Sequence, residues 1–192
     1  TFHVGKNAKI RYVEKHYGEG EGRGKRLMNP TTIIYLEEGS YMKMETTQIA
    51  GIDDTLRETK AEIAADAYLE IKEKILTTGN QQARSNFVTN LNGDGCSCNI
   101  VNRAVAKENS YQFFDSTMNG NADCSGHSEC DSIIMDHAKV AASPNLTATC
   151  EDASLIHEAA IGKIAGEQLI KLMTLGLTEE EAEEQVIAGF LR

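Results

Sequence analysis

Thiols and imidazoles gather in one short stretch of this chain. The segment GNADCSGHSECDSIIMDH contains Cys124, His127, Cys130 and His137. Thiolate and imidazole ligands together suit zinc, iron and iron–sulfur clusters. The spacing differs from the paired CxxC pattern of a structural zinc site. By themselves, these residues therefore indicate a metal or cluster site without naming the metal.

A second pair of cysteines lies upstream. Cys96 and Cys98 are two residues apart in the segment GDGCSCN. On a strand they would share one face, about 7 Å apart. Two thiols so placed could share a metal, or they could face the core as small apolar groups, and we favour the core.

A third candidate is the His157-Glu158 pair in the apolar segment SLIHEAAIGKI. It resembles the start of a zinc-protease HExxH motif, but position 161 is Ile, so the second imidazole is missing. On a strand, adjacent residues face opposite sides. Both side chains could therefore serve one site only at a strand end, at a bulge or across a subunit contact.

Composition limits the functions that these residues could serve. The 192 residues carry a formal net charge of −10 and no basic stripe, so we expect no nucleic-acid partner. No apolar run approaches a membrane span, and the first residues contain no signal-peptide core, so we expect no membrane association. Five cysteines cannot all pair internally, which favours a cytoplasmic protein.

The elements that must position these residues are mostly short strands. A small residue followed by alternating apolar and polar residues recurs along the chain, as in SYMKMET from Ser40, AYLEIKE from Ala67 and CSCNIVN from Cys96. The spacing of 26 to 29 residues between these copies favours the stacked rungs of a β-helix. We predict a mainly β core domain over residues 1–160. Since the chain begins at Thr1 within a strand-like pattern, we also expect the natural protein to have a further N-terminal part.

One charge-rich segment competes with this pattern. Residues 55–63 could form a helical turn, and we interpret them as part of a rung with a loop excursion. The glycine-rich residues 17–26 do not lead into a helix, and the GxxxxGK[ST] pattern of a Walker A loop is absent from the sequence. We therefore expect no ATP binding through such a loop.

Two short helices are predicted at the C-terminus, forming a hairpin over residues 161–192. The first would end at Gly176. The second would begin with a capping box between Thr178 and Glu181 and would place Ala182, Val186 and Phe190 on one face. The hairpin could cap the open end of the β region or bind a partner.

Residues 130–190 resemble the C-terminal half of the SufB/SufD family, the scaffold proteins of the Suf iron–sulfur cluster assembly system. The shared features keep their order and spacing: Cys130-Asp131-Ser132, Met135, Pro144, His157-Glu158-Ala159, Glu167-Gln168, Gly176-Leu177 and Gly189-Phe190. The resemblance implies a right-handed parallel β-helix with a C-terminal α-helical hairpin. Ile156 stands where SufB has a further glutamate, and His137 is displaced from the SufB pattern, so the chain is most similar to a short, archaeal-type SufB/D homologue.

The resemblance also implies roles for individual residues. Cys130 would accept sulfur, and Cys130, His157 and Glu158 would hold the growing cluster. Further ligands among Cys124, His127, His137, Cys96 and Cys98 stay open. Leu172 and Phe190 would anchor a partner on the helical tail.

The implied function is that of a scaffold without its own enzymatic activity. It would build a transient Fe–S cluster from iron and donated sulfur and pass it to apo-protein acceptors, in complex with an ABC-type ATPase and as a homodimer or a SufB/SufD-like heterodimer. Two alternatives from other classes are a zinc-binding metalloprotein or sensor that uses Cys124, His127, Cys130 and His137, and a structural β-helix interaction module.

Overall fold

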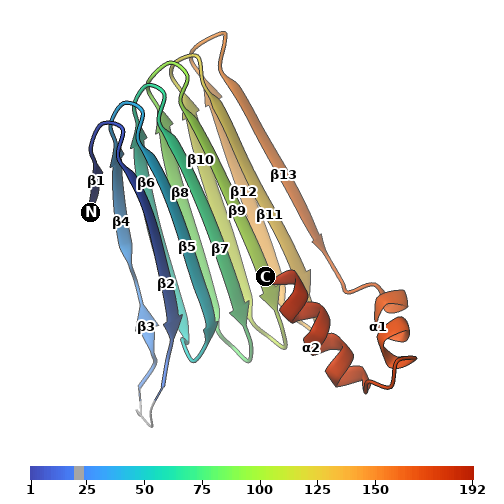
Figure 1. Cartoon of the computed structure of the whole chain (residues 1–192). Coiled ribbons are helices and arrows are strands. Elements are labelled where there is room, and N and C mark those ends of the chain that lie inside the picture. Colours follow the sequence, from blue (N-terminus) through green and yellow to red (C-terminus); the bar gives the residue numbers. More distant parts are fainter. Residues whose placement is uncertain (20–23) are drawn as a thin grey trace.

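Stacked parallel strands account for most of the chain in the computed structural model, which describes residues 1–19 and 24–192. Residues 20–23 of the glycine-rich segment lie outside the described residues. The strands form two sheets that face each other across the core (Figure 1). The predicted β-helix is confirmed as a parallel β-solenoid of about six turns.

Each turn of the solenoid contributes one strand to each sheet. Sheet A contains β1 (Phe2–Val4), β3 (Leu27–Met28), β4 (Thr31–Leu36), β6 (Asp54–Ile63), β8 (Gln82–Leu91), β10 (Tyr111–Gly120) and β12 (Lys139–Ala148). Sheet B contains β2 (Lys9–Tyr17), β5 (Tyr41–Ala50), β7 (Tyr68–Thr77), β9 (Ser97–Ala106), β11 (Ser125–Ile134) and β13 (Ser154–Gly162).

The strands of each sheet stack in constant register, apart from one shift between His16 and Tyr17 at the end of β2. Ser97 of β9 pairs with Ser125 of β11, and Ser125 pairs with Ser154 of β13. Turns between strands are tight, and residues such as Asp66 and Gly95 adopt a positive φ there. A residue that points inward in one turn therefore lies beside an inward residue in the next turn.

Alternation along each strand builds the core. In β7 the inward residues include Leu69 and Ile71, both fully buried, and they pack against Met44 and Ile100 of neighbouring turns. Burying such side chains contributes roughly 1.5–3 kcal/mol each. The same alternation directs Glu70 and Lys72 to the outer face, as predicted for a half-buried strand.

Residues 54–63 form one continuous strand, β6, so the predicted loop excursion is wrong. The physical reason is that Arg57 occupies an inward position, where the alternation rule expects an apolar residue. Its side chain is 2% exposed. It fits inside because Glu73 from β7 and Glu14 from β2 approach its guanidinium.

The Arg57 ion pairs lie in the solenoid interior. Arg57 Nη1 lies 2.5 Å from Glu14 Oε1, and Arg57 Nε lies 3.0 Å from Glu73 Oε1. The contact between Arg57 Nε and Glu73 Oε1 is an ion pair without a hydrogen bond. Burial raises the pKa of Glu73, and Arg57, followed by the nearby Ser85 hydroxyl and Asn102, opposes that rise. Arg57 is therefore the main group that favours the ionised form of Glu73, against the larger effect of burial.

The C-terminal hairpin contains α1 (Gly166–Met173) and α2 (Glu179–Phe190). The predicted capping box is confirmed: the Thr178 hydroxyl accepts from the Glu181 N–H, and the Glu181 carboxylate accepts from the Thr178 N–H. Ala182 is buried as predicted, together with Ile187, which the predicted stripe omitted.

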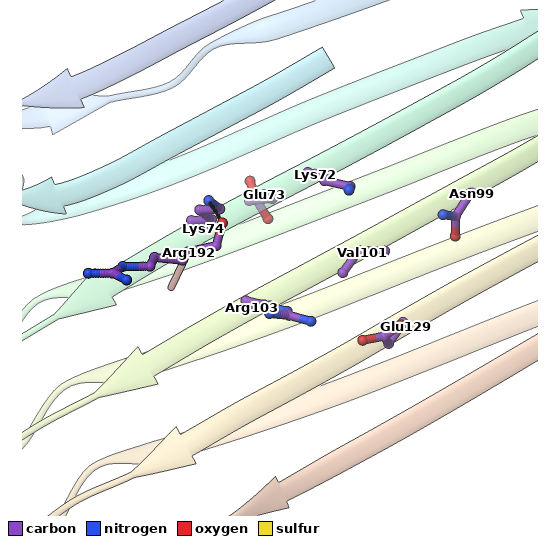
Figure 2. Close-up of a pocket in the computed structure, with 8 residues that line it drawn as sticks. All are labelled: Lys72, Glu73, Lys74, Asn99, Val101, Arg103, Glu129 and Arg192. Carbon is purple, nitrogen blue, oxygen red and sulfur yellow. Dashed lines mark hydrogen bonds between the residues drawn. The ribbon is translucent and has the colours of Figure 1, made fainter. Parts of the chain in front are cut away.

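The hairpin does not cap the open end of the solenoid. The end of α2 folds back on the outer face of sheet B, where Arg103 of β9 donates to the Phe190 carbonyl at 3.3 Å and lies 5.9 Å from the centre of its ring. Figure 2 shows Arg103 and Lys74 on this face, with Arg192 close to Lys74. Among the described residues, β12 and β13 each pair on one side only.

Replacing Arg57 tests the buried ion pairs. Arg57→Met should lower the free energy of unfolding by about 3–5 kcal/mol, because it leaves the Glu73 carboxylate buried without its cation. Arg57 opposes the rise that burial causes in the pKa of Glu73, so this pKa should rise further in the variant. Uptake of a proton by Glu73 at low pH then relieves part of the penalty, and the loss should be larger at pH 7.5 than at pH 5.

Urea unfolding at both pH values measures this loss. The double variant Arg57→Met/Glu73→Gln removes both charges and serves as the matched control, and it should recover most of the stability. A double variant as unstable as Arg57→Met, or a loss that is equal at both pH values, would contradict this account.

Candidate functional site

Cys130 occupies the inner face of β11 and is fully buried. It lies in one column of paired inward residues that runs across sheet B. In order from the N-terminal turn, the column contains Glu14, Thr46, Glu73, Asn102, Cys130 and Ala159. Because Ala159 belongs to the last strand, Cys130 lies one turn below the open end of the solenoid.

Hydrogen bonds connect this column to Cys130. Asn102 Nδ2 donates to Glu73 Oε2 at 2.8 Å, which aims Asn102 Oδ1 toward Cys130. The Cys130 thiol donates to that oxygen at 3.7 Å and lies 3.8 Å from the Ser132 hydroxyl. The Arg57–Glu73 pair therefore fixes the orientation of the amide that contacts the sulfur. Sequence reasoning missed Asn102, although the repeat spacing places it one turn before Cys130.

The environment of Cys130 favours the thiol over the thiolate. Burial raises its pKa to about 11, and the hydrogen bond with Ser132 opposes that rise. The proton of Cys130 must therefore leave before its sulfur becomes a ligand or a nucleophile.

His157 lies on the inner face of β13 and pairs with Ser128 of β11. Cys130 is two residues beyond Ser128 on that strand, so the Cα atoms of His157 and Cys130 lie about 8 Å apart by strand spacing and rise. Both ring nitrogens of His157 are buried, and neither has a hydrogen-bond partner among the described residues. Burial lowers the pKa of this imidazole, with the neighbouring His127 a smaller cause, so the neutral, metal-binding form is favoured.

An unpartnered buried imidazole is costly, because each ring nitrogen loses its hydrogen bond to water. A metal ion or cluster held beside Cys130 would provide His157 with a partner. The thiol and imidazole on this inner face therefore fit iron–sulfur cargo.

Glu158 points to the outer face of β13, and its side chain is 68% exposed. It pairs with Glu129 of β11 and lies 3.4 Å from His127 Nε2. The structure therefore brings Cys130 and His157 together on one face of the sheet and places Glu158 and His127 on the other.

The remaining candidates are dispersed. Cys124 precedes β11 and His137 follows it in an exposed turn, so a ten-residue strand about 33 Å long separates them. Cys130 and His127 face opposite sides of that strand. The four residues of the zinc alternative therefore do not form one site.

Cys96 and Cys98 both face the core, which agrees with the interpretation that we favoured. Burial raises the pKa of Cys98 to about 12. Cys96 lies in the turn next to that of Cys124, where the Ser125 N–H donates to the Cys96 carbonyl at 3.1 Å. The thiols of Cys96 and Cys98 are therefore both buried, and they lie away from Cys130.

The fold and the interior pair of Cys130 and His157 define a class of protein: a parallel β-solenoid with a helical hairpin and a buried thiol and imidazole on one inner face. The family described as SUF system FeS cluster assembly, SufBD core domain, matches residues 1–125 and, in a second, overlapping match, residues 58–190. The chain belongs to this SufBD family.

Relatives from several organisms agree with this assignment. The chain is 34% identical over 191 residues to an iron-sulfur cluster assembly SufBD family protein of Methanocaldococcus jannaschii, covering 98% of this chain and 60% of that protein. It is 30% identical over 193 residues to a protein of the same description from Pyrococcus horikoshii, covering 98% and 57%. The chain is 31% identical over 99 residues to the iron-sulfur cluster assembly protein SufB of Bacillus subtilis, covering 50% of this chain and 21% of that protein.

The chain thus spans about 60% of the length of the first of these relatives. Neither helix in the described part of the chain has the length and apolar character that a membrane crossing requires.

Burial predicts which thiols react in the folded protein. Iodoacetamide at pH 8 should modify Cys150, the one half-buried thiol of the five, well before Cys130, since the sulfur of Cys130 is enclosed and its pKa is raised to about 11. Mass spectrometry of peptides from native and urea-unfolded protein measures both rates. Equal labelling of Cys130 and Cys150 in the native protein would show that the interior is open to small reagents.

Proposed function

We propose that this protein is an assembly scaffold for iron–sulfur clusters, with Cys130 as the sulfur acceptor and first cluster ligand and His157 as the second. The observation that carries the proposal is the buried His157 imidazole without a hydrogen-bond partner, on the same inner face as the Cys130 thiol. Membership of the SufBD family supports the same function.

The chemistry of this pair suits cargo that must leave again. A cluster bound by four thiolates is held firmly, whereas one thiolate and one neutral imidazole bind it more weakly. Sulfur arriving as a persulfide on a donor would be attacked by the Cys130 thiolate, forming a new S–S bond to the transferred sulfur and releasing the donor thiolate. Iron binding to the sulfur of Cys130 would favour loss of the thiol proton.

Cys130 and His157 supply only two ligands, so other groups must fill the remaining coordination positions of the cluster. Inward residues of the last turn, such as Ala159 and Ile161, are exposed because no further turn covers them. We propose that a second copy of this chain, or a SufB/SufD-like partner, covers this open turn and completes the ligand set. The exposed Leu146 and Ile156 beside the two unpaired edges support a contact there.

Energy for assembly would come from a separate ABC-type ATPase that binds the hairpin. Of the two anchors expected from the sequence, Phe190 packs on Arg103 and Leu172 is half-buried. The exposed large apolar side chains of the hairpin are instead Ile170, Met173 and Leu175. An exposed apolar patch on a hairpin of this kind is typical of a protein–protein interface, so we propose it as the ATPase contact.

Anaerobic reconstitution with iron, sulfide and a thiol reductant tests the scaffold proposal. Wild-type protein should become brown and bind iron and sulfide, whereas Cys130→Ser should lose nearly all of the charge-transfer absorption while keeping its unfolding midpoint. His157→Ala should lower the iron bound per folded molecule. Cys150→Ser is the matched control, since it removes a thiol outside the inner site.

Equal cluster yield in wild type and Cys130→Ser would exclude Cys130 as the acceptor. A His157→Ala variant that loses stability but binds the same iron per folded molecule would give His157 a packing role only. Tight stoichiometric zinc without any brown product would favour the alternative of a zinc protein.

Binding of the ATPase tests the hairpin patch. The double variant Ile170→Ser/Leu175→Ser should weaken binding to the ABC-type ATPase of the same Suf system at least about tenfold, as loss of interface anchors does. Val13→Ser, which removes an exposed apolar residue from β2, is the control. Unchanged affinity in the double variant, measured by calorimetry, would place the contact elsewhere.

A further inference from the structure

A second group of metal-binding side chains lies on the outer face of sheet B. His127 and Glu129 of β11 and Glu158 of β13 each offer one ligand atom, and these atoms lie within 4.8 Å of one another. Strand register produces the group, because Glu129 pairs directly with Glu158, and His127 is two residues before Glu129 on the same face. Sequence reasoning missed Glu129, since a glutamate on an alternating strand resembles any solvated residue.

Asn99 determines which nitrogen of His127 can bind a metal. His127 Nδ1 lies 2.9 Å from Asn99 Oδ1, the neighbouring residue on β9. A carbonyl oxygen only accepts, so Nδ1 carries the hydrogen and donates it. The lone pair of Nε2 then faces the other two residues of the group. Metal-binding histidines commonly have this arrangement, with the second nitrogen donating to a carbonyl or carboxylate.

The contact between His127 and Glu158 is short enough for one metal ion to bind both side chains. Nε2 lies 3.4 Å from Glu158 Oε2, and a lone pair facing a carboxylate oxygen is unfavourable unless a proton or a metal ion lies between them. Asp131, two residues after Glu129 on β11, adds a third carboxylate to this face. Figure 2 shows Arg103 reaching toward Glu129 from β9. Arg103 and the other basic residues that line the pocket beside Glu129, Lys72, Lys74 and Arg192, lie on the side of β11 away from Glu158. A cation between Glu129 and Glu158 would lie on the acidic side of that strand.

We propose that His127 Nε2, Glu129 and Glu158 bind one divalent first-row transition-metal ion on the outer face of sheet B, with Asn99 as the residue that orients His127. One imidazole and two carboxylates suit Fe²⁺, Mn²⁺, Co²⁺ or Zn²⁺, whereas Cu⁺ prefers thiolates. Three protein ligands leave coordination positions open, so the ion can exchange. A holding site for iron on its way to the cluster is the role that we assign, and this role alone rests on the scaffold function proposed above.

The outer site is distinct from the interior one. Cys130 and His157 lie on the opposite face of the same two strands, so no single ion can contact both sets. At the open end, β13 has no neighbouring strand on its far side among the described strands. Only the backbone of sheet B lies between the outer group and the interior pair. Iron bound to the outer group would therefore lie across the sheet from the sulfur of Cys130.

Anaerobic titration with Co²⁺ alone tests the site in the full chain. Wild-type protein should bind one Co²⁺ per chain, with d–d absorption and without a thiolate-to-cobalt charge-transfer band. His127→Ala, Glu129→Gln and Glu158→Gln should each weaken binding by ten- to a hundredfold, and Asn99→Ala should weaken it by about tenfold through loss of its hydrogen bond. Glu58→Gln is the matched control, because it removes one carboxylate from the outer face of sheet A and should leave affinity unchanged.

Three outcomes would overturn the proposal. If wild-type protein binds no stoichiometric Co²⁺, the contact between His127 and Glu158 is a proton-sharing pair. If Glu58→Gln weakens binding as much as Glu129→Gln, attraction is by net charge alone. If Co²⁺ binding is lost in Cys130→Ser but kept in Glu129→Gln, the metal binds the interior thiol.

The two proposals fail separately. Retained Co²⁺ binding in Cys130→Ser, together with lost cluster reconstitution, supports both of them. Wild-type protein that forms no cluster, but binds Co²⁺ through His127, Glu129 and Glu158, keeps the outer site and removes the scaffold function.

Discussion

Constant register between stacked parallel strands is the constraint on which the rest of this structure depends. Because each strand pairs residue for residue with the strand one turn earlier, a position that points inward does so through every turn. Cys130 and His157 therefore lie inside the solenoid, whereas His127, Glu129 and Glu158 lie outside it. A shift of one residue in β13 would exchange His157 and Glu158 and would dismantle both groups.

One connected set of polar groups crosses the interior of the solenoid from β6 to β11. Arg57 enters the core because Glu14 and Glu73 neutralise it, and Asn102 satisfies the second oxygen of Glu73. The last member of this set is the Cys130 thiol, which donates to Asn102. Removing one charge would leave its partner buried and unpaired, which is why such networks are kept whole or replaced whole. The polarity around Cys130 thus depends on an ion pair two turns away.

The solenoid was predictable because its signal repeats. Strand alternation and the recurring spacing identified the stacked turns, and the Thr178 capping box identified the start of α2. Residues 54–63 were harder, since Arg57 occupies an inward position and breaks the apolar pattern. Local sequence carries no information about the partner that makes such an exception stable.

The site was only partly predictable for a related reason. Cys130, His157 and Glu158 have chemically distinctive side chains and match a family motif, so sequence could nominate them. Asn99 and Asn102 have ordinary side chains, and their roles come from their neighbours one turn away. The spacing itself holds this information: once strands are aligned at 28 or 29 residues, Cys130 falls on Asn102 and His127 on Asn99. Which face each residue occupies then follows from alternation, but distances and burial do not.

The open last turn gives the interior site its character. A thiol and an imidazole that were sealed beneath further turns could bind a metal but could not release a cluster. Here His157 lies in the final strand and Cys130 in the strand before it, so only β13 lies between Cys130 and the open end of the solenoid. An incomplete ligand set at an uncovered edge favours exchange over storage, because water, a small thiol or a partner subunit can replace a ligand without unfolding the core. On the scaffold proposal, the same geometry that leaves His157 without a partner would suit the site to cargo in transit.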